Sequence, residues 1–225
     1  MFPNLNKEYL DYIIVNLPIV ILSLTLHEIA HGYTAYRLGD LTAKNDGRLS
    51  LNPLRHIDPI GLVVLAIFHF GWAKPVMVNP KNLKNPKKDM AIISLAGPLT
   101  NYALSALFYI PLFAMGIKNP LVQDITGSGY LVLYLRMGFI MNISLASFNI
   151  LPVPPLDGSK VFGSLLPDRL YYKIVLFAPQ ISIGILLLLS VTGLLSYIIV
   201  PMMVSVTYLY YIAARFISGI FLIIS

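Results

Sequence analysis

The chain has 225 residues, of which 57% are hydrophobic and only 12% are charged, and its formal net charge is +6. Ordinary soluble domains carry roughly 25% charged residues, so this composition excludes a soluble protein and predicts an integral membrane protein. Cysteine is absent, which excludes disulfides, thiolate metal sites and a cysteine nucleophile.

Charges and prolines divide the sequence into apolar segments, and a helix needs about 20 apolar residues to cross a bilayer. Helical spans are expected at residues 9–38, 90–117, 127–151, 173–197 and 198–224. Residues 60–72 are too short for a comfortable crossing, and together with 74–78 they indicate a short re-entrant loop or β-hairpin at the membrane edge. The expected fold is an all-α integral membrane protein with about five to six transmembrane helices in a single domain, residues 1–225, without a separate soluble domain.

The basic residues predict the orientation of these spans. Nine Lys and Arg residues lie between residues 37 and 88, whereas the loop after the second span contains only Lys118. By the positive-inside rule the first long loop is cytoplasmic, which places the N-terminus outside. Because the positive charge is concentrated in particular membrane loops, we expect a lipid bilayer and no nucleic acid as a partner.

The first span contains His27-Glu28-Ile29-Ala30-His31, an HExxH pattern. Two histidines four residues apart lie on one helix face, so both imidazoles can bind a single zinc ion while Glu28 stands beside the water that the metal activates. An acidic residue at membrane depth costs about 3 kcal/mol, and such residues mark functional sites more often than structural ones. The pattern therefore predicts hydrolysis within a membrane, near the cytoplasmic end of the span.

A zinc hydrolase needs a third protein ligand and one open position. Asp157 follows the inner end of the third span and is the acidic residue best placed to supply that ligand. Taken alone, Asp157 also resembles the N-cap of a short helix. His56, in a charged loop, and His69, in the uncertain 60–72 segment, are the alternative third ligands.

Gly97 and Asn101 in the second span lie at about the same depth as the histidines, on the order of 10 to 17 Å from the cytoplasmic end. Asn101 has two interpretations. The first is an interhelical hydrogen bond, and the second is a donor to the substrate carbonyl or to the oxyanion that forms from it.

The combination of the HExxH pattern with residues 149–158, Asn-Ile-Leu-Pro-Val-Pro-Pro-Leu-Asp-Gly, resembles the site-2 proteases, the intramembrane zinc metalloproteases of the M50 class. Gly97 and Asn101 are similar to the Gly and Asn of the middle core helix in that family. The resemblance covers about residues 9–166, which it implies are a three-helix catalytic core, and leaves residues 173–224 as additional C-terminal helices.

The resemblance implies one zinc ion per chain, held by His27, His31 and Asp157, with Glu28 as general base. The implied function is hydrolysis of peptide bonds in transmembrane segments of membrane proteins, as in regulated intramembrane proteolysis. The sequence has no PDZ insertion and no CBS domains, which is compatible with a prokaryotic cell membrane. A substrate helix must unwind locally before cleavage, and strand addition to residues 72–78 is one way to achieve this.

The alternative function is a metal-ion transporter or a metal-binding membrane protein without protease activity. In that case the same polar side chains would line an ion path through the bilayer. Because the polar residues gather toward the cytoplasmic side, hydrolysis is favoured over transport.

Overall fold

The computed structural model describes residues 7–58, 61, 74–125, 128–177 and 179–224, and within these ranges it contains helices and no strand. The elements in chain order are α1 (Lys7–Arg37), α2 (Thr42–Asn45), η1 (Pro53–Arg55), η2 (Pro80–Asn82), α4 (Pro86–Ala114), α5 (Tyr130–Asn149), α6 (Asp157–Gly163), α7 (Asp168–Phe177), α8 (Pro179–Val191) and α9 (Ser196–Ile224). The expectation of an all-α membrane protein is confirmed.

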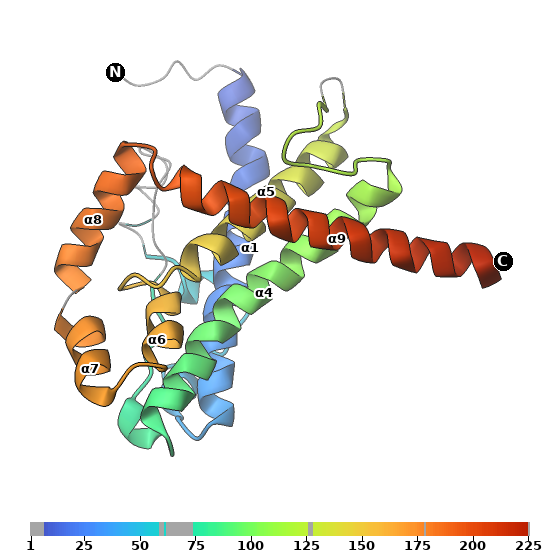
Figure 1. Cartoon of the computed structure of the whole chain (residues 1–225). Coiled ribbons are helices and arrows are strands. Elements are labelled where there is room, and N and C mark those ends of the chain that lie inside the picture. Colours follow the sequence, from blue (N-terminus) through green and yellow to red (C-terminus); the bar gives the residue numbers. More distant parts are fainter. Residues whose placement is uncertain (1–6, 59–60, 62–73, 126–127, 178, 225) are drawn as a thin grey trace.

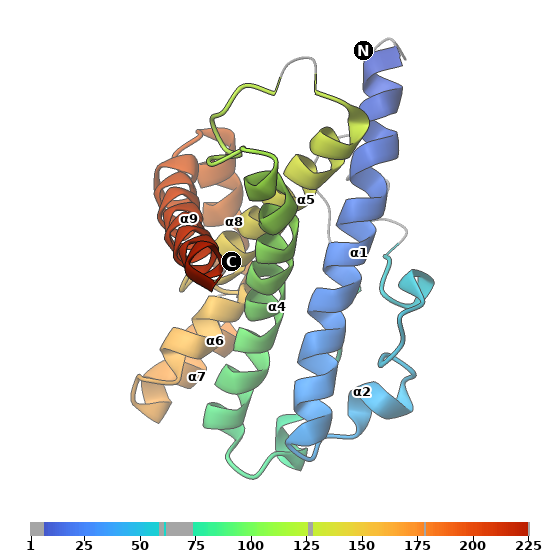
Figure 2. The ribbon, with the colours of Figure 1, turned by 90° about the vertical axis from the view of Figure 1, so that its right-hand side faces the viewer.

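The three helices expected to form the core lie together. Helices α1 and α4 run side by side in opposite directions, and α5 leans across both of them (Figure 2). The short α6 follows α5 and packs beside α4 (Figure 1). The end of α1 and the start of α4 therefore lie at the same end of the bundle, as expected from the basic loop that joins them.

Helices α4, α5 and α9 are each long and apolar enough to cross a membrane in the described part of the chain. Helix α1 has 31 residues and is about 46 Å long at 1.5 Å per residue, which also exceeds the hydrocarbon thickness. The number of crossings, five to six, stays a prediction.

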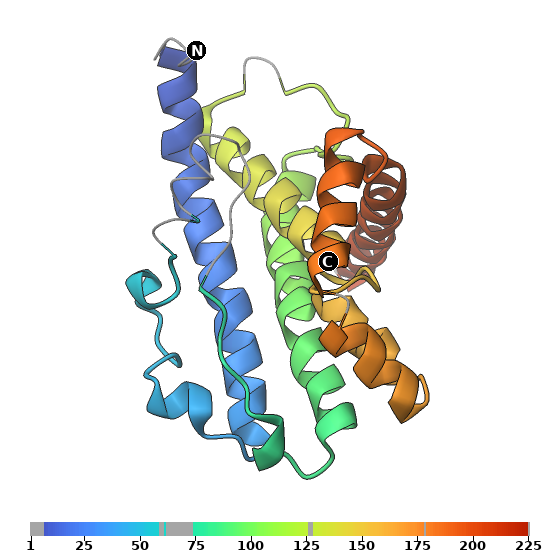
Figure 3. The ribbon, with the colours of Figure 1, turned by 90° about the vertical axis from the view of Figure 1, so that its left-hand side faces the viewer.

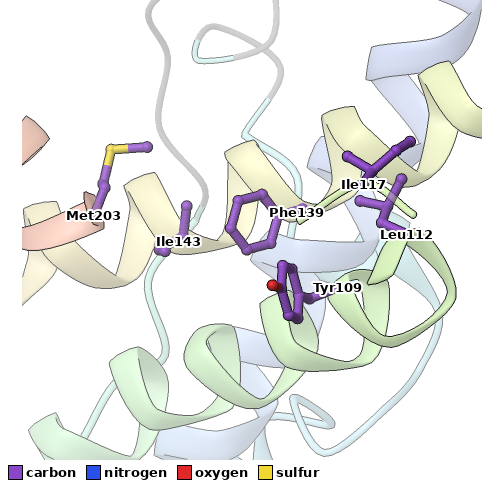
Figure 4. Close-up of a cluster of buried hydrophobic side chains, with 6 residues drawn as sticks. All are labelled: Tyr109, Leu112, Ile117, Phe139, Ile143 and Met203. Carbon is purple, nitrogen blue, oxygen red and sulfur yellow. The ribbon is translucent and has the colours of Figure 1, made fainter. Parts of the chain in front are cut away.

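A buried aromatic and aliphatic cluster joins α4, α5 and α9. Figure 4 shows its members, Tyr109, Leu112, Ile117, Phe139, Ile143 and Met203. The rings of Tyr109 and Phe139 lie 5.7 Å apart between centroids, and the Tyr109 hydroxyl donates to the carbonyl of Lys118 over 2.7 Å. Among the described residues, none of α1 belongs to this cluster or packs against it, so the cluster holds α4, α5 and α9 together without contacting the HExxH residues.

The C-terminal region differs from the expected span at residues 173–197. It forms two shorter helices, α7 and α8, and the 13 residues of α8 cover only about 20 Å. Pro179 is the first residue of α8, where the fixed φ and missing N–H of proline are compatible with the start of a new helix. Helix α9 crosses α5 and α4, and its C-terminal end extends past them (Figure 1).

The re-entrant loop or β-hairpin expected at residues 60–72 lies outside the described residues, apart from residue 61. Residues 74–78 are described, form neither helix nor strand, and run beside α1 toward η2 (Figure 3). The residues that follow them are held by Asp40, a fully buried carboxylate just after α1. Asp40 accepts hydrogen bonds from the Asn79 backbone N–H and the Asn82 side chain, both at 2.7 Å.

Candidate metal centre

The structure brings His27, His31 and Asp157 to one point, where α1, α4 and the start of α6 meet. The Nε2 atoms of the two histidines lie 3.0 Å apart. The Asp157 Oδ2 atom is 3.3 Å from Nε2 of His27 and 3.2 Å from Nε2 of His31. All three residues are at least 90% buried. In the described part of the chain, these are the His, Asp and Glu side chains whose ligand atoms lie close enough together to bind one metal ion.

The other ring nitrogen of each histidine has a partner on α4. His31 Nδ1 lies 2.7 Å from the carbonyl oxygen of Ile93, and His27 Nδ1 lies 2.5 Å from Oδ1 of Asn101. A carbonyl oxygen can only accept, so Nδ1 of His31 carries the proton and its Nε2 offers a lone pair. These contacts give the imidazoles the orientation that metal-binding histidines require.

Gly97 makes room for this close approach of α1 and α4. A Cβ atom at position 97 would lie 2.5 Å from Nε2 of His31 and 2.6 Å from Nε2 of His27. Side-chain atoms do not tolerate such distances, so any larger residue would push the imidazoles away from their present position. The glycine that the sequence singled out in the second span therefore lies directly against the two histidines.

Asp157 occupies the first position of α6, and the N-cap is Leu156, whose side chain makes no capping hydrogen bond. The interpretation of Asp157 as an N-cap is therefore wrong, because its carboxylate points to the histidines instead of the helix terminus. The neighbouring Gly158 lies against the carbonyl groups of Ile150 and Leu151, with no space for a Cβ. The turn after α5 thus holds the start of α6 close to α1 and α4.

Glu28 follows His27 on α1, and its carboxylate accepts a hydrogen bond from the backbone N–H of Val76 over 2.8 Å. Residues 74–78 therefore pass directly beside the expected general base. No sequence pattern pointed to this contact, because it joins segments 48 residues apart through a loop with no regular structure.

Asn101 is fully buried, and both polar atoms of its side chain are engaged within the protein. Its Oδ1 atom faces His27, and its Nδ2 atom donates to Oδ1 of Asn142 on α5 over 2.9 Å. This arrangement corresponds to the interhelical interpretation and adds a contact to a histidine that the sequence did not predict. Asn142 was also missed, although an amide inside an apolar span is itself a signal for a buried polar contact.

The alternative third ligands do not join this group in the described part of the chain. His56 is almost fully buried in the loop after α2, where its Nε2 donates to the Ser50 carbonyl over 2.8 Å. His69 lies outside the described residues.

The two nitrogens and one carboxylate oxygen form a donor set typical of catalytic zinc. Ligands about 2.0–2.1 Å from a tetrahedral ion lie roughly 3.3–3.4 Å from one another. The three separations of 3.0, 3.2 and 3.3 Å fit that requirement. Three protein ligands leave the fourth tetrahedral position open, and Glu28 lies one residue from a ligand.

Comparison with known proteins agrees with this chemistry. The family model described as Peptidase family M50 matches residues 114–191, which include Asp157. The chain is 36% identical over 194 residues to "Putative zinc metalloprotease YwhC" of Bacillus subtilis (strain 168), covering 86% of each chain. It is 31% identical over 153 residues to Rip2 of Mycolicibacterium smegmatis, which carries the same description, with 65% of this chain and 54% of Rip2 covered.

A third relative is "Zinc metalloprotease MJ0392" of Methanocaldococcus jannaschii, 28% identical over 191 residues, with 83% of this chain and 45% of that protein covered. No solved structure matches the chain. The similarity to YwhC extends over 86% of the length of both proteins. The chain therefore belongs to peptidase family M50.

Proposed function

We propose that His27, His31 and Asp157 hold the zinc ion of this intramembrane M50 peptidase and that Glu28 is its general base. The observation that carries the proposal is the mutual spacing of the three donor atoms, 3.0 to 3.3 Å, which is the separation of ligands around one tetrahedral ion. The surrounding contacts support it, since Ile93 and Asn101 occupy the Nδ1 atoms and leave both Nε2 atoms to face Asp157.

Each of these residues has a separate role in peptide hydrolysis. Bound zinc supplies Lewis acidity, which lowers the pKa of a water molecule and polarises a carbonyl group. Glu28 accepts the proton of the attacking water and later delivers it to the nitrogen of the leaving group. The N–H of Val76 holds the Glu28 carboxylate in a fixed orientation during these transfers. Asn101 positions His27 instead of contacting the substrate.

The proposed substrates are transmembrane segments of other membrane proteins. His27 and His31 lie in the second half of α1, which ends at Arg37, and the basic residues of the loop that joins α1 to α4 follow directly. By the positive-inside rule this end of the bundle is cytoplasmic and the N-terminus lies outside. The bacterial relatives support a prokaryotic cell membrane as the location. A substrate helix must break its internal hydrogen bonds locally before one of its peptide groups can be cleaved. Residues 74–78 pass beside Glu28, so they are placed to pair with the unwound substrate segment as an added strand.

The test uses the purified full chain and two variants. We expect the wild type to contain one zinc ion per chain and to cleave a model transmembrane peptide in detergent or liposomes. Glu28→Gln should keep the zinc and lose cleavage, whereas Asp157→Ala should lose the zinc. Cleavage by Glu28→Gln, or an unchanged zinc affinity in Asp157→Ala, would contradict the assignment of these residues.

A further inference from the structure

A chain of hydrogen bonds connects α5 to His27 through α4. Asn142 on α5 is fully buried, and its Nδ2 atom donates to the Gly138 carbonyl over 2.8 Å. Its Oδ1 atom accepts from Nδ2 of Asn101 at 2.9 Å, and Oδ1 of Asn101 lies 2.5 Å from Nδ1 of His27. The mechanism described above makes no use of Asn142, which does not touch the three donor atoms.

The direction of every bond in this chain follows from its first member. A backbone carbonyl can only accept, so Asn142 must turn its NH2 group toward Gly138 and its oxygen toward Asn101. Asn101 must then turn its NH2 group toward Asn142 and its oxygen toward His27. An amide oxygen can only accept as well, so Nδ1 of His27 carries a proton and donates it.

We propose that Asn142 is a positioning residue that fixes the tautomer of His27 through Asn101. This inference rests on the proposed zinc site. With the proton on Nδ1, the Nε2 atom of His27 keeps a lone pair directed at Asp157 and His31, which is the form that binds a metal. If Asn101 were reversed, its NH2 group would face Nδ1, and the ring proton would move to Nε2 and block the site.

The two histidines differ in this respect. His31 donates directly to the Ile93 backbone carbonyl, which cannot reverse. His27 faces a side-chain amide, and a side-chain amide has two possible orientations related by a flip. His27 therefore depends on the groups that select the orientation of Asn101, and of these Asn142 at 2.9 Å is closer to its Nδ2 atom than the Ser23 carbonyl at 3.5 Å. Burial of an asparagine in an apolar span costs free energy unless its polar atoms form hydrogen bonds. Both polar side-chain atoms of Asn142 do so, with Asn101 and with the Gly138 carbonyl.

The test compares two substitutions at the same position. Asn142→Leu has a similar size but neither donor nor acceptor, so the orientation of Asn101 would depend on the long 3.5 Å hydrogen bond from its Nδ2 atom to the Ser23 carbonyl alone. Asn142→Asp in its neutral form has an O–H that can donate to the Gly138 carbonyl and a C=O that can accept from Asn101, so it can form the same chain of hydrogen bonds. Ser147→Ala is the matched control, because Ser147 is a buried α5 residue that contacts Tyr102 of α4 at 3.4 Å, away from His27.

The first readout is the zinc dissociation constant, measured by competition with a chelator. Loss of a partner behind a metal-binding histidine weakens metal affinity about 10- to 100-fold, and we expect this for Asn142→Leu. Asn142→Asp and Ser147→Ala should stay close to the wild type. Equal losses in Asn142→Leu and Ser147→Ala would show that helix packing is responsible and would overturn the proposal.

The second readout needs no variant at position 142. Nitrogen-15 NMR of histidine-labelled, zinc-free wild type, recorded at alkaline pH, distinguishes the two tautomers of a neutral imidazole. We expect a proton on Nδ1 of His27, assigned with a His27→Gln variant. A proton on Nε2 would overturn the proposal even if Asn142→Leu fails to fold. The tautomer is read on zinc-free protein, so failure of the zinc site itself would appear separately, as a wild type without zinc.

Discussion

Val76 donates its backbone N–H to the Glu28 carboxylate over 2.8 Å, although 48 residues separate the two in the sequence. The hydrogen bond orients the proposed base without using a side chain, so a side-chain substitution at position 76 would leave it intact. Removal of the N–H itself requires proline.

We expect Val76→Pro to lower kcat for peptide cleavage by about 10- to 100-fold while the zinc content stays unchanged. The estimate follows from the roughly 1.5–3 kcal/mol that a hydrogen bond to a charged group contributes. Met77→Pro is the matched control, because Met77 is exposed and its N–H donates no hydrogen bond recorded among the described residues. An equal loss in both variants would attribute the effect to the path of residues 74–78 and not to the bond with Glu28.

Gly97→Ala should weaken zinc binding. The added methyl group would lie about 2.5 Å from the Nε2 atoms of His27 and His31 and would force them apart. Overpacking costs about 1–3 kcal/mol, equivalent to roughly a 5- to 150-fold change in an equilibrium constant. Zinc stoichiometry and chelator competition measure the effect. Gly184→Ala on α8, where a Cβ meets no atom within 4 Å, should bind zinc as the wild type does.

Asp40 predicts a pH dependence of stability. Burial alone would raise the pKa of this carboxyl, but hydrogen bonds from Thr42, Asn82 and Asn79 outweigh burial and hold the pKa below its ordinary value of 3.8. A depressed pKa means that the ionised form stabilises the fold above the unfolded-state pKa and that this contribution is lost as the pH falls through the folded-state pKa.

The wild-type unfolding temperature should therefore drop as the pH falls below about 4, near the unfolded-state pKa of an aspartate. Asp40→Asn should be less stable at neutral pH and should show a smaller drop over the same range. Thermal unfolding in detergent between pH 3 and pH 7 measures both curves. Parallel curves for the two proteins would show that Asp40 does not contribute to the acid sensitivity.

The ion pair between Lys87 and Asp168 should contribute little. Its Nζ and Oδ1 atoms are 2.9 Å apart, but the Asp168 side chain is 77% exposed and water screens the attraction. We expect Asp168→Asn to change the free energy of unfolding by less than about 1 kcal/mol, within reach of a denaturant titration. A much larger change would mean that this pair, which joins α4 to α7, fixes the C-terminal helices.

The sequence predicted the parts of the site that depend on local spacing. The four-residue interval of His27 and His31 requires a shared helix face, and the Pro-Pro-Leu-Asp-Gly segment after an apolar span returns Asp157 to the same end of the bundle. Membrane composition placed α4 and α5 within a few residues of their observed bounds. These features follow from helix geometry and from the thickness of a bilayer.

The contacts that orient these residues could not be predicted in the same way. The pairing of Asn101 with Asn142 depends on how far α4 and α5 are rotated about their axes, and hydrophobic spans of nearly uniform composition do not define that rotation. The segment that carries Val76 is held by hydrogen bonds from Lys74 to the His56 carbonyl and from Asn79 to Asp40, which join residues with no periodic pattern. The N-cap interpretation of Asp157 was wrong because a local capping preference was outweighed by a long-range partner.

His31 and Asp157 are 126 residues apart in the sequence, because α4 and α5 lie between them in the chain. During synthesis the first helix alone therefore carries an incomplete ligand set. With the proposed ligand set, the metal can be bound only after the intervening helices have been inserted and α6 has been synthesised, so we expect the newly made chain to be inactive until then.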